Sequence, residues 1–394
     1  MRARRLLSGA GTFRECAHCA APSAGVHVIA TFGDSLPALF VAFVAAAVLA
    51  LLITPLLIRV AVRAGAVDLP DARRVNDQPV PRGGGIAVAL AFVLVATAAI
   101  LVNERTELLR DPLGLETPEV VAVLLGGVAA TLLGALDDVL QIRARWQLLT
   151  QVLLALIPIA VGVTVTRLTN PVGSGPIDLP GPFAIGFTIL WIVGMINSIN
   201  FIDGLDGLSS GVALIAAITL GLISFTTAID EPVVGLLCFV LAGALLGFLR
   251  WNFHPATIFI GTSGVMFVGY ALGILSILGP AKVAVALLVL GVPIIDTFWI
   301  IVRRLATGRS PFTPDRGHIH HRLLDLGLSH SQTVLVIWGI CLVLGVLSFV
   351  LSGGQVYAFL GLAIAFGFGL FLLTRCQSGD ALKDESYKLP ADQD

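Results

Sequence analysis

Four polar side chains recur at intervals of three within one short segment of this chain. The segment INSINFIDGLDGLSSG, residues 196–211, contains Asn197, Asn200, Asp203 and Asp206. Carboxylate and amide oxygens are hard ligands that suit Mg²⁺ or Mn²⁺ ions, which keep some of their waters and meet substrate phosphates. On a regular helix these side chains would sweep half the circumference, whereas a tighter turn would stack them, and Gly204 and Gly207 permit a break near Asp203. The segment is a candidate divalent-metal site.

A second acidic group, Asp137 and Asp138, lies in the sequence LDDV. Two adjacent carboxylates are costly in hydrocarbon but can lie at a membrane interface or in a wet cleft. Neighbouring residues on a helix point about 100° apart, so both can reach one centre only if the helix ends there or if one acts indirectly. A solvated helix end is the plain alternative, and the acidic segment at 196–211 favours a shared site.

A third polar segment, SPFTPDRGHIHHRLLDLG, supplies cationic groups. It contains Arg316, His318, His320, His321 and Arg322 within seven residues. Histidines at this spacing could bind zinc, but no cysteine accompanies them and the hard-metal carboxylates lie elsewhere. Phosphate recognition fits better, because histidine and arginine donors can hold diphosphate oxygens and offset charge that shifts during transfer. A basic loop that only sets membrane topology is the alternative.

The chain that must position these groups is strongly apolar. Of its 394 residues, 57% are hydrophobic and 12% are charged, and its mean hydropathy is +0.95. A soluble domain has no interior large enough for such a composition, whereas runs of about 20 apolar residues span a bilayer. Continuous runs without strict alternation favour helices over a closed barrel. We expect an all-α polytopic membrane protein with about 11 transmembrane helices, near residues 37–58, 84–102, 119–136, 148–165, 183–199, 209–228, 233–249, 264–278, 283–302, 333–352 and 355–373.

The distribution of positive charge predicts the orientation of these helices. An odd number puts the termini on opposite sides, and with the N-terminus outside, two thirds of the 24 Lys and Arg residues fall inside. Cytoplasmic loops carry such an excess, so the C-terminus and the loops at 59–83 and 303–332 are expected in the cytoplasm. All the unusual polar segments then share the cytoplasmic face. Between the fourth and fifth helices, residues 164–181 favour either a short outer hairpin or a simple connector.

Both ends of the chain differ from its apolar body. We expect residues 1–35 to be a disordered tail or an over-long predicted start, 36–374 the transmembrane domain, and 375–394 a disordered cytoplasmic tail. Cys16, His18 and Cys19 lie together near the start, but a structural zinc site needs four well-spaced ligands and no second pair follows.

Several of these segments, in order, resemble the polyprenyl-phosphate N-acetylhexosamine-1-phosphate transferases, in particular the bacterial undecaprenyl-phosphate GlcNAc-1-phosphate transferase branch. The resemblance runs from about Asp68 to Gly327. It rests on DLPDARRVNDQPVPRGGGIA, the Asp pair, NSINFIDGLDGLSSG, FIGTSGVMFVG, PIID and SPFTPDRGHIHHRLLDLG. The form DRGHIHHRL is similar to the GlcNAc branch rather than the MurNAc-pentapeptide branch, which tends to carry three consecutive histidines.

The resemblance implies a function and a cell location. A sugar 1-phosphate, foremost GlcNAc-1-phosphate, would pass from a UDP-sugar to undecaprenyl phosphate with release of UMP, starting lipid-linked cell-envelope polysaccharide. The implied cofactor is Mg²⁺ or Mn²⁺, and the implied place is the bacterial plasma membrane. The implied partners are the UDP-sugar, the polyprenyl phosphate and the bilayer; no nucleic acid is expected, and a homodimer is left open.

The resemblance also assigns roles to residues of this chain. Asp137 and Asp138 would be the pair near the metal or activating the lipid phosphate, and with Asp203 and Asp206 they form the expected catalytic set. The expected substrate-binding residues are Asn197, Asn200, His318, His320, His321, Arg316, Arg322, Arg73 and Arg82, with Asp296 as a secondary member. The expected metal ligands are Asp203, Asp206, Asn197 and Asp137, with Thr262 as a further candidate.

Three positions depart from the family pattern. Gln141 stands where many relatives have a third Asp after the pair, and Asn76 where a His often precedes the PxPR stretch. Thr262 stands where relatives commonly carry a metal-binding Asp, which predicts a weaker metal site. Thr262 makes an inactive relative one alternative. The others are a phospho-MurNAc-pentapeptide transferase and a cation-coupled transporter, since intramembrane Asp and Asn also mark ion pathways.

Overall fold

The protein is almost entirely helical. The computed structural model describes residues 24–68, 79–106, 117–168, 175–226, 231–278, 282–306, 317–351 and 356–364, together with 109, 170, 308 and 310. Its helices are α1 (Ala24–Ala64), α2 (Gly85–Thr106), α3 (Pro118–Leu140), α4 (Ala144–Ala160), α5 (Gly181–Ile202), α6 (Leu208–Ser224), α7 (Pro232–Asn252), α8 (Gly261–Ile277), α9 (Lys282–Val289), α10 (Gly291–Ala306), α11 (Ile319–Asp325) and α12 (His330–Val350). Residues 356–364 are also helical.

Two short antiparallel hairpins connect helices. The strand β1 (Val67–Asp68) pairs with β2 (Val80–Pro81), and β3 (Arg167–Leu168) pairs with β4 (Ile177–Asp178). The second pair forms a short hairpin, which is one of the two alternatives that the sequence left open for residues 164–181. The Cys16–Cys19 segment, the tail at 375–394 and the loop residues 69–78 and 311–316 lie outside the described residues.

The helices are long and apolar enough for a multi-pass membrane protein. Six described helices could each span a bilayer: α1 from Ser35, α2, α3, α5, α7 and α12. The pair α9 and α10, bent by 74° at its break, gives up to seven, and α4, α6 and α8 are shorter apolar helices. The chain is thus an all-α membrane protein, and these elements follow the first ten expected segments in order. The number eleven stays a prediction, because most of 355–373 is not described.

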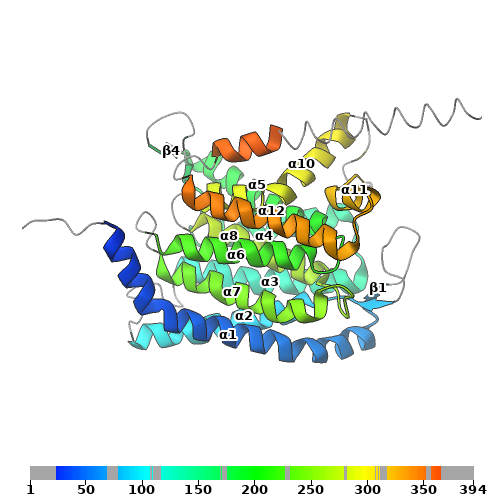
Figure 1. The fold of residues 1–394 in the computed structure, drawn as a ribbon, viewed down its shortest axis with the longest axis horizontal. Coiled ribbons are helices and arrows are strands. Elements are labelled where there is room, and N and C mark those ends of the chain that lie inside the picture. Colours follow the sequence, from blue (N-terminus) through cyan, green and yellow to red (C-terminus); the bar gives the residue numbers. More distant parts are fainter. Residues whose placement is uncertain are drawn as a thin grey trace, which may run out of the picture.

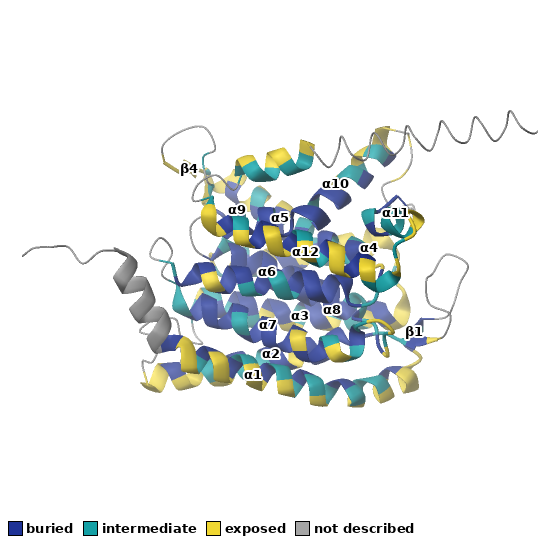
Figure 2. Ribbon diagram, in the orientation of Figure 1, coloured by how far each residue is buried: buried dark blue, intermediate teal, exposed yellow. Residues whose placement is uncertain are grey.

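The helices lie side by side with the connecting segments gathered at their ends. Figure 1 shows β1 and α11 at one end of the bundle and β4 at the other. Burial divides the bundle into a lipid-exposed edge and a core. In the apolar 18-residue stretch of each helix, 78% of the residues of α7 are buried, against 22% of those of α1 (Figure 2). A helix that is apolar all round must face either other helices or lipid, so α1 is a lipid-facing edge and α7 belongs to the core.

Close packing of α3 on α8 fixes the ends of both helices near β1. A Cβ built on Gly134 of α3 would lie 2.5 Å from the Thr262 oxygen and from the Ser263 Cα. At the other end of the same contact, the Tyr270 hydroxyl donates to the Ala122 oxygen at 2.8 Å. Small residues let helices approach in this way in membranes, where packing rather than water exclusion drives association.

The glycine contact predicts a selective loss of stability. Gly134→Ala must push α3 away from the backbone of α8, at a cost of about 1–3 kcal/mol for such overpacking. Thermal unfolding of the purified protein in detergent is expected to show a lowered midpoint. Gly186→Ala in α5 is the matched control, because nothing lies within 4 Å of a Cβ built there; equal midpoints for the two variants would contradict the packing described.

Candidate functional site

The side chain of Asp138 joins the end of α3 to the start of α8. Its two oxygens accept the backbone N–H groups of Thr262, at 2.7 Å, and of Ser263, at 3.0 Å. The first N–H groups of a helix lack partners within it, and a carboxylate there also meets the positive end of the helix dipole. Gly261, at φ 72°, precedes them, and a Cβ built on it would lie 2.7 Å from an Asp138 oxygen. Asp138 is 5% exposed and positions the first turn of α8.

Asp137 points to another neighbour, as the rotation of about 100° per residue requires. Its Oδ1 accepts the Ile142 N–H at 2.9 Å and the Gln147 Nε2–H at 2.8 Å. Between them Gln141 adopts φ 50°, so the chain turns sharply from α3 into α4. The pair therefore organises two separate junctions, and the metal role expected for Asp137 stays a prediction.

The helix break expected near Asp203 is present between α5 and α6. Helix α5 ends at Ile202 and α6 begins at Leu208, with Gly207 at φ 76° between them. Asn200, Asp203 and Asp206 line one cavity. Asn197 faces elsewhere, because its Nδ2 donates to the Gln151 oxygen of α4 at 2.6 Å and to the Val193 oxygen at 2.8 Å.

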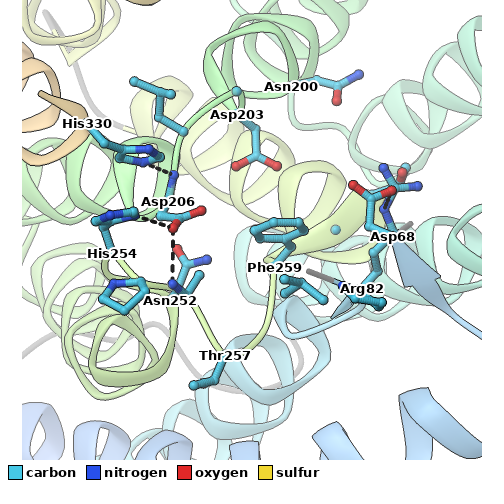
Figure 3. A pocket seen from close by; sticks show the side chains of 18 of the residues that line it. Asp68, Arg82, Asn200, Asp203, Asp206, Asn252, His254, Thr257, Phe259 and His330 are labelled. Atoms are coloured by element: carbon cyan, nitrogen blue, oxygen red, sulfur yellow. Dashed lines mark hydrogen bonds and ion pairs between the residues drawn. The ribbon is translucent and has the colours of Figure 1, made fainter. Parts of the chain in front are cut away.

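The cavity occupies about 830 Å³ at the end of the bundle where β1 and β2 lie (Figure 3). Its polar wall includes Asn200, Asp203, Thr262 and His321, together with Arg82 of the segment after β2. The Arg82 guanidinium is held by Asp68 of β1, with Nε 3.2 Å from the carboxylate. The end of α7 and the segment that follows it also line the cavity, with Asn252, His254, Pro255, Ala256, Thr257 and Phe259.

Burial governs the protonation of Asp203. Burial raises the pKa of this carboxyl from its ordinary 3.8 to about 6; the charges of Asp138 and Asp206 add to the rise, while the Ser209 hydroxyl, which donates at 2.6 Å, and Arg82 oppose it. A bound cation would stabilise the ionised form, because an opposite charge favours a carboxylate over the neutral acid. Asp203, Asn200 and Thr262 all line the cavity, and their side chains carry oxygen donors of the kind that a hard divalent ion prefers.

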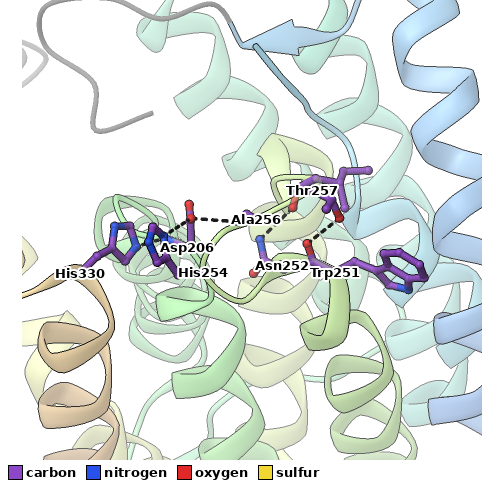
Figure 4. Close-up of polar contacts among 8 residues, drawn as sticks. Asp206, Trp251, Asn252, His254, Ala256, Thr257 and His330 are labelled. Atoms are coloured by element: carbon purple, nitrogen blue, oxygen red, sulfur yellow. Dashed lines mark hydrogen bonds and ion pairs between the residues drawn. The ribbon is translucent and has the colours of Figure 1, made fainter. Parts of the chain in front are cut away.

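Asp206 lies in a cluster that the sequence did not reveal. Its Oδ2 lies 2.8 Å from His254 Nδ1 and accepts the Ala256 N–H at 3.0 Å, while its own N–H donates to His330 Nε2 at 2.8 Å (Figure 4). His254 and His330 are isolated histidines in sequence, 48 and 124 residues from Asp206. Only the tertiary fold brings these two histidines to Asp206.

The histidine segment packs against the same break from the other side. His318 Nδ1 lies 2.7 Å from the buried Asp296 carboxylate, which also accepts the Ile319 N–H at 3.0 Å. The secondary role expected for Asp296 is therefore to orient His318 and the start of α11.

The three histidines of this segment have different surroundings. The His320 ring lies so close to Gly204 that a side chain there would collide with it. Burial, followed by the charges of His321, His318 and His330, lowers the pKa of His320 well below its usual value, so it is neutral at pH 7. His321 alone of the three lines the cavity.

The remaining expected residues divide between this site and segments that are not described. Arg322 donates from Nε to the Gly317 oxygen at 3.0 Å, which ties it to the start of α11. Thr262 lines the cavity, and its N–H donates to Asp138; its place as a metal ligand stays a prediction. Arg73 and Arg316 lie outside the described residues.

Comparison with known proteins gives consistent matches across the segments that form this site. A family model described as glycosyl transferase family 4 matches residues 120–280. A protein of Bacillus subtilis strain 168, named "Probable undecaprenyl-phosphate N-acetylglucosaminyl 1-phosphate transferase", is 35% identical over 323 residues, which cover 80% of this chain and 86% of the relative.

Relatives from other bacteria carry similar names. A decaprenyl-phosphate N-acetylglucosaminephosphotransferase of Mycolicibacterium smegmatis is 32% identical over 81% of this chain and 84% of its own. An undecaprenyl-phosphate alpha-N-acetylglucosaminyl 1-phosphate transferase of Thermotoga maritima is 27% identical over 74% of this chain and 84% of its own.

The raised pKa of Asp203 predicts how metal binding depends on pH. Below about pH 6 a proton occupies the carboxylate and an ion must displace it, so the affinity should fall about tenfold per pH unit there and level off above. Electron paramagnetic resonance of Mn²⁺ added to the purified protein measures this directly. Asp203→Asn is expected to bind weakly without this pH dependence, and equal affinity of the unaltered protein at pH 5 and 7 would contradict the assignment.

Proposed function

The chain belongs to glycosyl transferase family 4, the polyprenyl-phosphate N-acetylhexosamine-1-phosphate transferases, and from that premise we propose that it transfers GlcNAc-1-phosphate from UDP-GlcNAc to a polyprenyl phosphate, releasing UMP. Undecaprenyl phosphate is the proposed acceptor, and the product would start a lipid-linked cell-envelope polysaccharide in the bacterial plasma membrane. The names of the relatives support a polyprenyl-phosphate acceptor and a GlcNAc-1-phosphate group.

One observation carries the proposal: an acidic helix break and a held arginine share a cavity at the end of a membrane bundle. Asp203 and Asn200 come from the break after α5, and Arg82 comes from the segment after β2. A soluble nucleotide donor and a lipid-anchored acceptor can meet only near the membrane surface. A cavity of about 830 Å³ is of the size that small-molecule sites occupy.

The distribution of Lys and Arg residues supports an orientation of the bundle in the membrane. Described cations near the cavity end include Arg59, Arg63, Arg143, Arg145, Arg250 and Arg303, whereas Arg105, Arg167 and Lys282 lie in segments near the opposite end. Because cytoplasmic segments carry the excess of Lys and Arg, we expect the cavity to open to the cytoplasm, where a soluble UDP-sugar can enter it.

Mg²⁺ or Mn²⁺ is the proposed cofactor, with Asp203 as its main ligand and Asn200 and Thr262 beside it. When bound, the ion would supply positive charge against the diphosphate and the leaving UMP. Asp206 shares the cavity, but its Oδ2 is already bound to His254 and Ala256. Asp137 and Asn197 contact α4, so the family roles as ligands stay predictions for them.

The reaction forms one bond and breaks one. An oxygen of the acceptor phosphate attacks the β-phosphorus of the donor, and the bond from that phosphorus to the oxygen of the α-phosphate breaks, so that UMP leaves. Arg82, fixed by Asp68, is suited to hold diphosphate oxygens, because a guanidinium binds phosphate through two donors. Phosphoryl transfer of this kind depends chiefly on positioning and electrostatics.

Two further groups position the reactants. A phosphate monoester loses its second proton at about pH 6, so the acceptor phosphate is already a nucleophile at neutral pH without an enzyme base. Asp138, whose oxygens hold the amides of Thr262 and Ser263, therefore serves first to position α8, ahead of the base role that the resemblance suggested. His321 reaches the cavity as a phosphate donor, with His318 held by Asp296 behind it.

An assay with defined substrates, in which UMP release and the lipid product are measured, tests the proposed function. Purified protein with Mg²⁺, undecaprenyl phosphate and UDP-GlcNAc is expected to release UMP and form lipid-linked GlcNAc-1-phosphate. Asp203→Asn should abolish release by loss of the metal ligand. Asp138→Asn should abolish it while lowering the unfolding midpoint, because one of the two backbone amides that Asp138 holds would face an NH2 group and lose its acceptor, at a cost of about 1–3 kcal/mol.

A matched control accompanies this assay. Asp178→Asn removes an exposed carboxylate of β4, whose partner is Arg167, and should leave the rate near that of the unaltered protein. No UMP release with any UDP-sugar, including UDP-MurNAc-pentapeptide, would support an inactive relative, and near-normal rates in Asp203→Asn would overturn the site.

Thr262 predicts a weakened metal site that one substitution can strengthen. Thr262→Asp adds a carboxylate to the cavity wall at the start of α8, so the Mg²⁺ concentration for half-maximal activity should fall about tenfold, the effect of about 1.4 kcal/mol. Thr257→Asp adds the same charge elsewhere on the wall and should not lower it. An unchanged Mg²⁺ titration in Thr262→Asp would count against Thr262 as a neighbour of the ion.

A further inference from the structure

Another group of side chains that line the cavity is of the kinds that can bind a metal ion. It consists of Asp206, His254 and His330, whose ligand atoms all lie within 4.8 Å of one another. The three residues come from the break between α5 and α6, the segment after α7, and the first turn of α12 (Figure 3). No two of them are neighbours in sequence, so the grouping is a property of the fold.

The atoms of the group are already drawn together. His254 Nδ1 lies 2.8 Å from Asp206 Oδ2, and His330 Nε2 accepts the Asp206 N–H at 2.8 Å (Figure 4). The two imidazole rings stack with their centroids 4.2 Å apart and their planes 17° apart. A tetrahedral site with metal–ligand bonds of about 2.1 Å separates its ligand atoms by roughly 3.4 Å. Small rotations of these side chains would therefore place three ligand atoms at three corners of such a site.

The donor types select a kind of ion. Two imidazole nitrogens and one carboxylate oxygen are ligands of zinc and related transition metals, whereas Mg²⁺ prefers oxygen ligands. All three residues line the cavity, and the His254 side chain is 42% exposed, so an ion can enter and keep a fourth position for water. This chemistry differs from the oxygen donors around Asp203.

Binding of an ion would replace the two hydrogen bonds that Asp206 makes with His254 and His330. The proton between His254 and Asp206 would be released, since a metal replaces a proton on its ligands. His330 would give up the Asp206 N–H, which then faces the cavity. In return, one ion would tie α12 to the two segments that form this wall.

We propose that Asp206, His254 and His330 form a binding site for a zinc-class divalent ion, separate from the magnesium site around Asp203. The site does not depend on the proposed sugar-phosphate transfer, because its ligands and its test involve the metal alone.

Zinc binding to the full-length purified protein in detergent is the direct test. Isothermal titration with Zn²⁺ is performed with Cys16 and Cys19 changed to serine, because those thiols and His18 can themselves bind zinc. One ion should bind per chain with excess Mg²⁺ present, and the unfolding midpoint should rise as Zn²⁺ is added. His254→Ala and His330→Ala should each weaken binding at least tenfold and remove the rise in midpoint.

Two further variants make the result specific. His321→Ala removes another cavity histidine, one that belongs to the segment at 316–322, and should leave zinc binding unchanged. His254→Cys should retain zinc binding, since a thiolate is a zinc ligand, and it guards against loss through misfolding. Unaltered binding in His254→Ala, or equal loss in His321→Ala, would overturn the site, and so would absence of binding to the folded protein.

Discussion

The carboxylate of Asp138 on the first amides of α8 is the contact that the candidate site depends on. It joins residues 124 and 125 positions apart, and it is possible only because Gly134 lets α3 lie against α8 and Gly261 leaves room for the carboxylate. The same contact sets the direction of Thr262 into the cavity. In a membrane bundle, where apolar surfaces do not discriminate among neighbours, such polar and glycine contacts define which helix ends meet.

The helix break after Ile202 is the second feature on which the site depends, and it opposes stability. Asp203 is half-buried, and its raised pKa means that ionisation costs free energy in the folded protein. Ser209 and Arg82 offset only part of that cost. A carboxylate with a pKa raised in this way, inside a cavity, is typical of functional sites, and it supports the proposal that this end of the bundle binds a cation.

Local sequence predicted the helices and the break after α5, and several of the residues it singled out line the cavity. Hydropathy located the helices because continuous apolar length is what a bilayer demands, and paired glycines located the break. Spacing of three misleads at Asn197, because α5 stays regular to Ile202 and carries that side chain round to Gln151 of α4. The rotation of a helix separates Asp137 from Asp138 in the same way.

The rest of the site depends on contacts between distant segments. His254 and His330 reach Asp206 only through the packing of α7 and α12, and no local pattern marks an isolated histidine as part of a cluster. Asp296 is similar, since its partner His318 lies 22 residues away beyond the end of α10.

The most direct test is a structure by electron cryo-microscopy of the protein in lipid nanodiscs with UDP-GlcNAc and Mg²⁺. We expect diphosphate density in the cavity beside Arg82 and Asp203, with Asp138 still accepting the amides of Thr262 and Ser263. Nucleotide bound at the β3–β4 end of the bundle, or a cavity empty at saturating donor, would contradict this expectation.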